Sequence, residues 1–123
     1  MYINGKWIEK GIGEVVVKNP ATGEVVGTVP KLSKEQIEEA INAADEAFKT
    51  WSQLPAIQRS NYLYRVAEIM RERKEDLARI ATLEMGKALV DMRGEVQAAI
   101  DYVQWYAEEG RRVYGETIPS NVA

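Results

Sequence analysis

The segment LVDMRGEVQAAIDYVQWYAEEGRRVY, residues 89–114, carries the longest helical pattern of the chain. Its apolar residues recur at helical spacing, which predicts one helix that ends at Gly115. Such a helix has about 26 residues and is on the order of 40 Å long. A compact domain of about 100 residues has a radius of gyration near 13 Å. We therefore expect the helix to protrude or to lie along a larger body. The pattern consists of Leu89, Met92, Val96, Ala99, Ile100, Val103, Tyr106, Ala107, Val113 and Tyr114.

Three shorter helices are predicted before it, and they can cover only part of its length. Ser33 and Gln36 form a capping-box pattern at the start of the first helix. Pro55 can begin the second helix, which breaks near residues 73–74, and Gly86 is placed to end the third. The first helix carries the stripe Ile37, Ala40, Ile41, Ala44, Ala47, Phe48 and Trp51.

The first 32 residues are typical of β-structure. Asn4-Gly5 predicts a two-residue hairpin turn, because both residues tolerate a positive φ. Residues 15–17 and 25–29 read as two further strands around a tight turn at 19–23, and Pro30 is expected to end the second. Thr117-Ile118 looks like the start of another strand. We expect an α+β chain forming a single partial domain over 1–123: β-rich at 1–32, helical at 33–115, and the start of a strand at 116–123.

Composition narrows the classes of function. With 123 residues the chain is at most one domain, and 46% hydrophobic and 28% charged residues are ordinary globular values. A net charge of -3 disfavours nucleic acid and anionic membranes as partners. The first residues lack the apolar core of a signal peptide and no segment is apolar enough to span a bilayer, so a cytoplasmic location is the expectation. With no cysteine and no histidine, disulfides and thiolate metal sites are excluded.

Four segments, taken together and in this order, resemble the N-terminal region of NAD(P)-dependent aldehyde dehydrogenases, with the greatest likeness to the succinate-semialdehyde and lactaldehyde members. They are YINGKW at 2–7, NPATGEVVGTVP at 19–30, LEMGK at 83–87 and YGETIP at 114–119. The resemblance implies the leading part of the family's α/β cofactor-binding domain. It also implies an enzyme that oxidises an aldehyde to a carboxylic acid with NAD or NADP.

The residues that perform this chemistry in the family have no counterpart here. The nucleophilic cysteine, the Pro-Trp-Asn motif and the Glu-Leu-Gly-Gly motif of the general base are all missing. The pattern Gly11-Ile12-Gly13 has Val16 in place of a third glycine, and no helix is predicted after it. We therefore assign no catalytic and no cofactor-binding residue, and we expect the chain alone to bind no dinucleotide and to be catalytically incompetent.

Glu84 is a candidate metal ligand. It lies in LEMGK, on the predicted apolar stripe of the third helix, where a carboxylate needs a partner. The resemblance implies that Glu84 helps to hold a monovalent cation together with a backbone carbonyl at Val17 or Lys18. The alternative is a hydrogen bond or salt bridge to Lys87 or a backbone amide.

The resemblance also implies a role for the fourth helix beside the channel through which the aldehyde reaches the thiol. The matching positions are Glu95, Ala98, Ala99 and Tyr102. The small residues would leave room and Tyr102 would narrow the passage. The alternative for the chain alone is helix packing or exposure to solvent.

Three functional interpretations remain open. The chain is an N-terminal fragment or truncated relative of an aldehyde dehydrogenase, a non-enzymatic helical module that self-associates, or one chain of a split enzyme. The expected partner is accordingly a second copy, in a homodimer or higher homo-oligomer, or the missing remainder of the enzyme.

Overall fold

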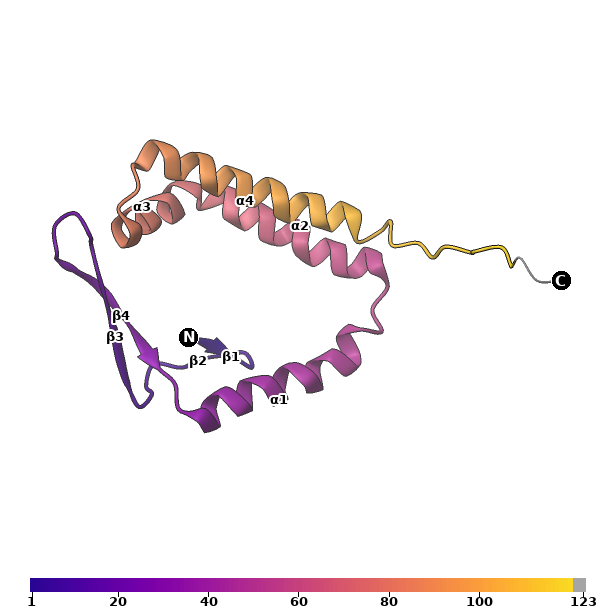
Figure 1. The fold of residues 1–123 in the computed structure, drawn as a ribbon, viewed down its shortest axis with the longest axis horizontal. Helices are drawn as coiled ribbons and strands as arrows, with labels where there is room; N and C mark the ends of the chain where they lie inside the picture. The colour runs from indigo at the N-terminus through magenta and orange to yellow at the C-terminus, as the bar shows by residue number, and fades with distance from the viewer. Residues whose placement is uncertain (121–123) are drawn as a thin grey trace.

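A computed structural model describes residues 1–120, in which two small β-ribbons precede four helices (Figure 1). This arrangement confirms the expected α+β class with strands first and helices after. The elements are β1 (Tyr2–Ile3), β2 (Lys6–Trp7), β3 (Gly13–Lys18), β4 (Val25–Lys31), α1 (Lys34–Trp51), α2 (Ala56–Glu72), α3 (Lys74–Met85) and α4 (Leu89–Glu109).

Both ribbons are antiparallel hairpins, β1 with β2 and β3 with β4. The predicted turn is confirmed, since Asn4 and Gly5 have φ values of 48° and 77°. Pro30 does not end its strand as expected but lies within β4, opposite Glu14. A proline is tolerated there because each strand of a two-stranded ribbon is an edge, where an N–H directed away from the partner is not needed.

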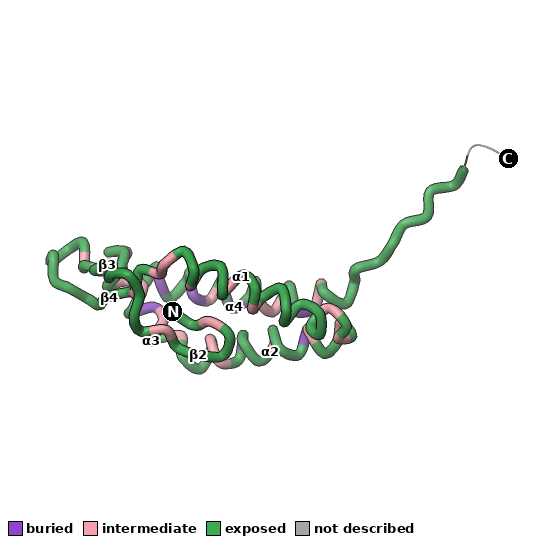
Figure 2. Tube along the Cα trace, turned by 90° about the horizontal axis from the view of Figure 1, so that it is seen from below, coloured by how far each residue is buried: buried purple, intermediate pink, exposed green. Residues whose placement is uncertain are grey.

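The core lies where α2, α3 and α4 pack together. Small residues let the helices approach closely, and Ile100 is the largest side chain that is fully buried. Figure 1 shows α2 and α4 running side by side, with the shorter α3 at one end of the pair. In Figure 2 the buried residues are confined to few positions along the trace, and most of the chain is exposed. The core cluster comprises Ala67, Ala78, Met92, Val96 and Ile100.

Helix α1 stands apart from this core. Its predicted cap is confirmed, because the Ser33 hydroxyl accepts from the Gln36 N–H at 3.2 Å and the Ser33 N–H donates to the Gln36 side chain at 2.9 Å. Yet α1 contains no buried residue and does not cover α4. At its C-terminal end the ring of Trp51 lies 5.2 Å from that of Tyr62. The sequence pattern correctly predicts the helix, but its apolar stripe is left uncovered.

Helix α4 is shorter than the pattern indicates. It has 21 residues and ends at Glu109, with the Gly110 N–H donating to the Tyr106 carbonyl at 3.0 Å. Val113 and Tyr114 keep the helical spacing but are 84% and 80% exposed. Because both side chains stay largely in solvent, little burial offsets the low helix propensity of Gly110.

The predicted strand at the end of the chain is not formed in the described residues. Residues 116–120 are extended without regular secondary structure, and 121–123 lie outside the described residues. A strand needs a partner for its backbone groups, and Figure 1 shows this segment leading away from both ribbons. Among residues 1–120 there is also no helix long and apolar enough to cross a membrane.

Candidate functional site

The four predicted channel residues share one face of α4. Glu95, Ala98, Ala99 and Tyr102 follow each other at spacings of three and four, and all four are exposed. The side chains that fill the core, among them Ile100, point from another side of the same helix. The structure therefore brings the predicted residues together on a surface that α2 and α3 leave open.

A shallow hollow of about 430 Å³ lies on this face, next to the rings of Trp105 and Tyr106. These two rings meet edge to face, with centroids 4.9 Å apart. Ala98 contributes only a methyl group, whereas Tyr102, Trp105 and Tyr106 contribute aromatic rings. The lining residues are Ala98, Asp101, Tyr102, Trp105 and Tyr106. An apolar surface of this kind can hold a small organic molecule or a partner's side chain.

Three lining residues were not among the sequence-predicted ones. Asp101, Trp105 and Tyr106 lie three, seven and eight residues after Ala98, so the helical period could have identified them. Asp101 accepts a hydrogen bond from the Gln97 amide at 2.9 Å, which fixes the carboxylate at the edge of the hollow.

At the N-terminal end of this face, Glu95 is paired with Lys87. The hydrogen bond to Glu95 raises the pKa of Lys87, and the charges of Glu95 and Asp91 act in the same direction. This ion pair ties the segment between α3 and α4 to α4 itself. Lys87 is therefore paired with Glu95, and not with Glu84 as one alternative had it.

The proposed cation ligands Glu84 and Val17 lie on α3 and β3, which contact each other. The expectation that Glu84 faces the core is wrong. The end of α3 packs against the turn between β3 and β4, since a Cβ on Gly86 would lie 2.7 Å from the Pro20 ring. Val17, on β3, is partly buried. Glu84 is exposed, however, and does not face the core. It lies six residues after the buried Ala78, which places it about 120° around the helix from that residue.

Residues 1–120 contain no group of three or more acidic, histidine or cysteine side chains that could hold a metal ion. A cation at Glu84 would therefore depend on backbone carbonyls and on ligands from elsewhere. Monovalent and other hard cations accept such oxygen ligands.

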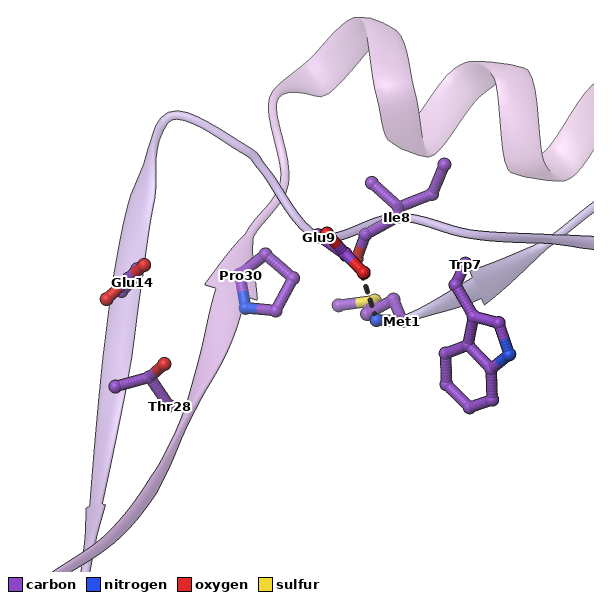
Figure 3. A pocket seen from close by; sticks show the side chains of 7 residues that line it. All are labelled: Met1, Trp7, Ile8, Glu9, Glu14, Thr28 and Pro30. Atoms are coloured by element: carbon purple, nitrogen blue, oxygen red, sulfur yellow. Dashed lines mark hydrogen bonds between the residues drawn. The ribbon is translucent and has the colours of Figure 1, made fainter.

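A second hollow, of about 280 Å³, lies between the two β-ribbons (Figure 3). The hydrogen bond drawn there runs from the Met1 ammonium to the Ile8 carbonyl at 3.0 Å and closes the ends of the first hairpin. Its ionisable side chains are those of Glu9 and Glu14. None of the lining residues is a nucleophile paired with a base. The lining residues are Met1, Trp7, Ile8, Glu9, Glu14, Thr28 and Pro30. We assign no chemistry to this hollow.

The segment Gly11–Gly13 does not have the form of a dinucleotide-binding loop. Gly11 and Gly13 lead into strand β3, whereas a pyrophosphate is held where a glycine-rich loop opens a helix. A Cβ on Gly11 would lie 2.1 Å from the Lys31 carbonyl oxygen, so this glycine is needed where two backbone segments approach each other closely.

Comparison with known proteins places these features in a family. The sequence profile of the aldehyde dehydrogenase family matches residues 7–123. Over 121 residues the chain is 47% identical to the glutarate-semialdehyde dehydrogenase of Pseudomonas putida, and over 122 residues it is 43% identical to the NADP(+) succinate-semialdehyde dehydrogenase of Escherichia coli. Each match covers 98% of this chain and 25% of the relative. The chain thus spans about a quarter of the length of the curated relatives it matches.

Solved structures agree with the sequence matches. An NADP-dependent enzyme of E. coli superposes with a TM-score of 0.92 at 41% identity, covering 98% of this chain and 25% of that one. A betaine aldehyde dehydrogenase of Staphylococcus aureus, solved in complex with NAD+, superposes with a TM-score of 0.89 at 32% identity over the same shares. The matching part in these enzymes is their N-terminal portion. With sequence and fold in agreement over nearly its whole length, the chain belongs to the aldehyde dehydrogenase family.

Proposed function

We propose that residues 1–123 are part of the cofactor-binding domain of an enzyme that oxidises a semialdehyde to the corresponding carboxylic acid with NAD or NADP. The observation that carries this proposal is the match, over 98% of the chain, to relatives named for glutarate and succinate semialdehydes. Further relatives are named for aspartate and malonate semialdehydes, at 47% and 42% identity. A substrate that carries a carboxyl group as well as the aldehyde is common to these four names.

The contribution of this chain is to shape the path of the aldehyde rather than to react with it. Aldehyde oxidation of this type needs a thiolate nucleophile, and the chain has no cysteine. In the complete enzyme the exposed face of α4 would line the approach to the thiol. Ala98 and Ala99 would leave room there, and Tyr102 would narrow the passage. The hollow at Ala98 and Tyr102 and the ion pair that fixes Glu95 support this role.

The dinucleotide would be held by residues outside this chain, because the glycines here precede a strand. A monovalent cation would be held in the complete enzyme by the carboxylate of Glu84 and the carbonyl of Val17. The packing of α3 against β3 and the following turn supports that pairing. The cation would stabilise the contact between the ribbon and the helices without taking part in the oxidation.

A chimera tests the proposal. Residues 1–123 would replace the equivalent first quarter of the E. coli succinate-semialdehyde dehydrogenase, and reduction of NADP by succinate semialdehyde would be followed by absorbance. We expect the chimera to turn over and the 123-residue chain alone to give no more signal than a heat-treated control. A chimera that is folded and binds NADP but has no activity would contradict the proposal.

The role of α4 is tested in the same chimera. Tyr102→Ala should change KM for the aldehyde several-fold, because it widens the proposed path, and should leave the affinity for NADP unchanged. Val90→Ala is the matched control, since Val90 is 70% exposed on the same helix but on another side. Equal effects of the two substitutions would count against a channel role.

A further inference from the structure

The hollow on α4 contains one charged side chain, and its charge is negative. Asp101 is lined up there with the methyl group of Ala98 and three aromatic rings, and none of the lining residues is basic. Within residues 1–120, Asp101 accepts a hydrogen bond from the Gln97 amide and forms no ion pair. A carboxylate without a cationic partner attracts positively charged ligands and repels negatively charged ones. The charge of a ligand is therefore what this hollow can distinguish.

A network of three side chains holds the carboxylate in place. The Lys74 ammonium donates to Gln97 Oε1 at 2.8 Å, and Gln97 Nε2 donates to Asp101 Oδ1 at 2.9 Å. An ammonium group only donates and an ionised carboxylate only accepts, so the two contacts together determine which way the Gln97 amide points. Lys74 begins α3, and both it and Gln97 are partly buried. Each contact joins two residues of this chain, so the network does not depend on the part of the relatives that this chain does not span.

The aromatic rings beside Asp101 favour a positive charge as well. Tyr102 follows Asp101 directly, and the ring pair of Trp105 and Tyr106 lies about one turn further along α4. The face of an aromatic ring carries a partial negative charge and attracts an ammonium group, most strongly in tryptophan. A ligand with an ammonium group would thus meet a carboxylate and aromatic rings in one hollow, whereas a purely anionic ligand would meet no positive charge among the lining residues.

From these observations we infer that Asp101 is a specificity-determining residue that favours an aldehyde bearing an ammonium group, with Gln97 and Lys74 as its positioning residues. Asp101 can act in this way only if the face of α4 lines the path of the aldehyde, so this role rests on the proposed function. It narrows the substrate class from semialdehydes in general to those that carry an amino group beside the carboxyl group.

Two aldehydes that differ in one group test this preference in the chimera described above. Aspartate semialdehyde and succinate semialdehyde have the same carbon chain and the same carboxylate, and only the first bears an ammonium group. Repulsion between Asp101 and the carboxylate therefore cancels in the ratio of kcat/KM for the amino aldehyde to that for succinate semialdehyde. A hydrogen bond to a charged group is worth roughly tenfold in affinity, so Asp101→Asn should lower this ratio about tenfold.

The matched control is Asp91→Asn, which removes a negative charge from α4 outside the hollow and should leave the ratio unchanged. An unchanged ratio for Asp101→Asn, or equal changes in the two variants, would overturn the assignment of Asp101.

Substitutions of Lys74 test the positioning role separately. Removing the positive charge of Lys74 would by itself favour an ammonium ligand and raise the ratio. Lys74→Met should nevertheless lower the ratio, because the Gln97 amide and the carboxylate lose their fixed orientation. Lys74→Arg keeps a cationic donor and should restore the ratio, and KM for NADP should be unchanged in both variants. A raised ratio for Lys74→Met would exclude Lys74 as a positioning residue.

The 123-residue chain provides a readout that needs no turnover. Its three tryptophans include the exposed Trp7 and Trp51, and replacing both by phenylalanine leaves Trp105 as the fluorescent reporter of the hollow. Butylammonium should change this fluorescence in a saturable manner, butyrate at the same ionic strength should not, and Asp101→Asn should abolish the response. A response of this kind beside an inactive chimera would refute the proposed function and leave the preference for a cation standing. No response to butylammonium, an equal response to both ions, or a response that Asp101→Asn leaves intact would overturn that preference.

Discussion

Replacing Ile100 by alanine tests the core directly. Ile100 is 0% exposed and belongs to the cluster of α2, α3 and α4, and no other residue of its size or larger is as completely buried in the described chain. The substitution removes three carbon atoms, which is about 2.4 kcal/mol of transfer free energy at about 0.8 kcal/mol per buried methylene. The cavity left among packed helices adds to this loss, so we expect about 3–4 kcal/mol in total. Such a loss is a large fraction of the 5–15 kcal/mol that typical domains possess.

The assay is urea unfolding followed by far-UV circular dichroism, with all variants at one protein concentration. Ile80→Ala is the matched control, because Ile80 is 52% exposed on α3 and its truncation should lower the free energy of unfolding by less than about 1 kcal/mol. If both substitutions had the same effect, or if Ile100→Ala lowered the free energy by less than about 1 kcal/mol, the three helices would not be held by this core.

Two further predictions concern the end of α3 and the behaviour in acid. Gly86→Ala should destabilise the fold by about 1–3 kcal/mol in thermal unfolding, because Gly86 has a φ of 79° and a Cβ there would meet the Pro20 ring. Gly23→Ala is the control, because Gly23 has a φ of 77° but open space around it. This control should show only the smaller effect of the backbone conformation. The hydrogen bonds from Arg93 lower the pKa of Glu75 to about 2 from 4.5. The ionised carboxylate therefore contributes stability that is fully present above about pH 4.5 and is lost as the pH falls toward 2. Glu75→Gln should flatten the acid limb of a plot of melting temperature against pH, and an unchanged limb would exclude this pair as its cause.

The parts of the fold that the sequence predicts well are those fixed by local chemistry. The helix cap at Ser33, the turn at Asn4-Gly5 and the left-handed end at Gly86 each depend on a few neighbouring residues. A side-chain oxygen near a free N–H, or a glycine where φ must be positive, specifies the backbone whatever surrounds it. These features can therefore be predicted from the sequence alone.

The errors concern features that depend on what the chain packs against. The helical spacing continues past Gly110, but Val113 and Tyr114 have no core to join, so α4 ends early. Glu84 was expected to face the core because it follows the apolar residues of α3, yet it lies off the buried side of the helix. The spacing of apolar residues shows which residues share a face of a helix. It does not show which face another element covers.

The same distinction governs the site on α4. That Glu95, Ala98, Ala99 and Tyr102 share a face follows from the helical period and needs no structure. Whether that face is a hollow depends on how the aromatic side chains lie, and the two rings that shape it, Trp105 and Tyr106, follow the predicted residues at the same period.

Helix α1 is the element whose surroundings the sequence determines least. Its stripe has the period and bulk of a core helix, but none of its residues is buried by the described chain. Apolar side chains in such a row gain free energy only when atoms from another surface replace water, so the pattern specifies a contact without identifying its partner. In a protein of the length of the relatives, the rest of the polypeptide can supply that surface.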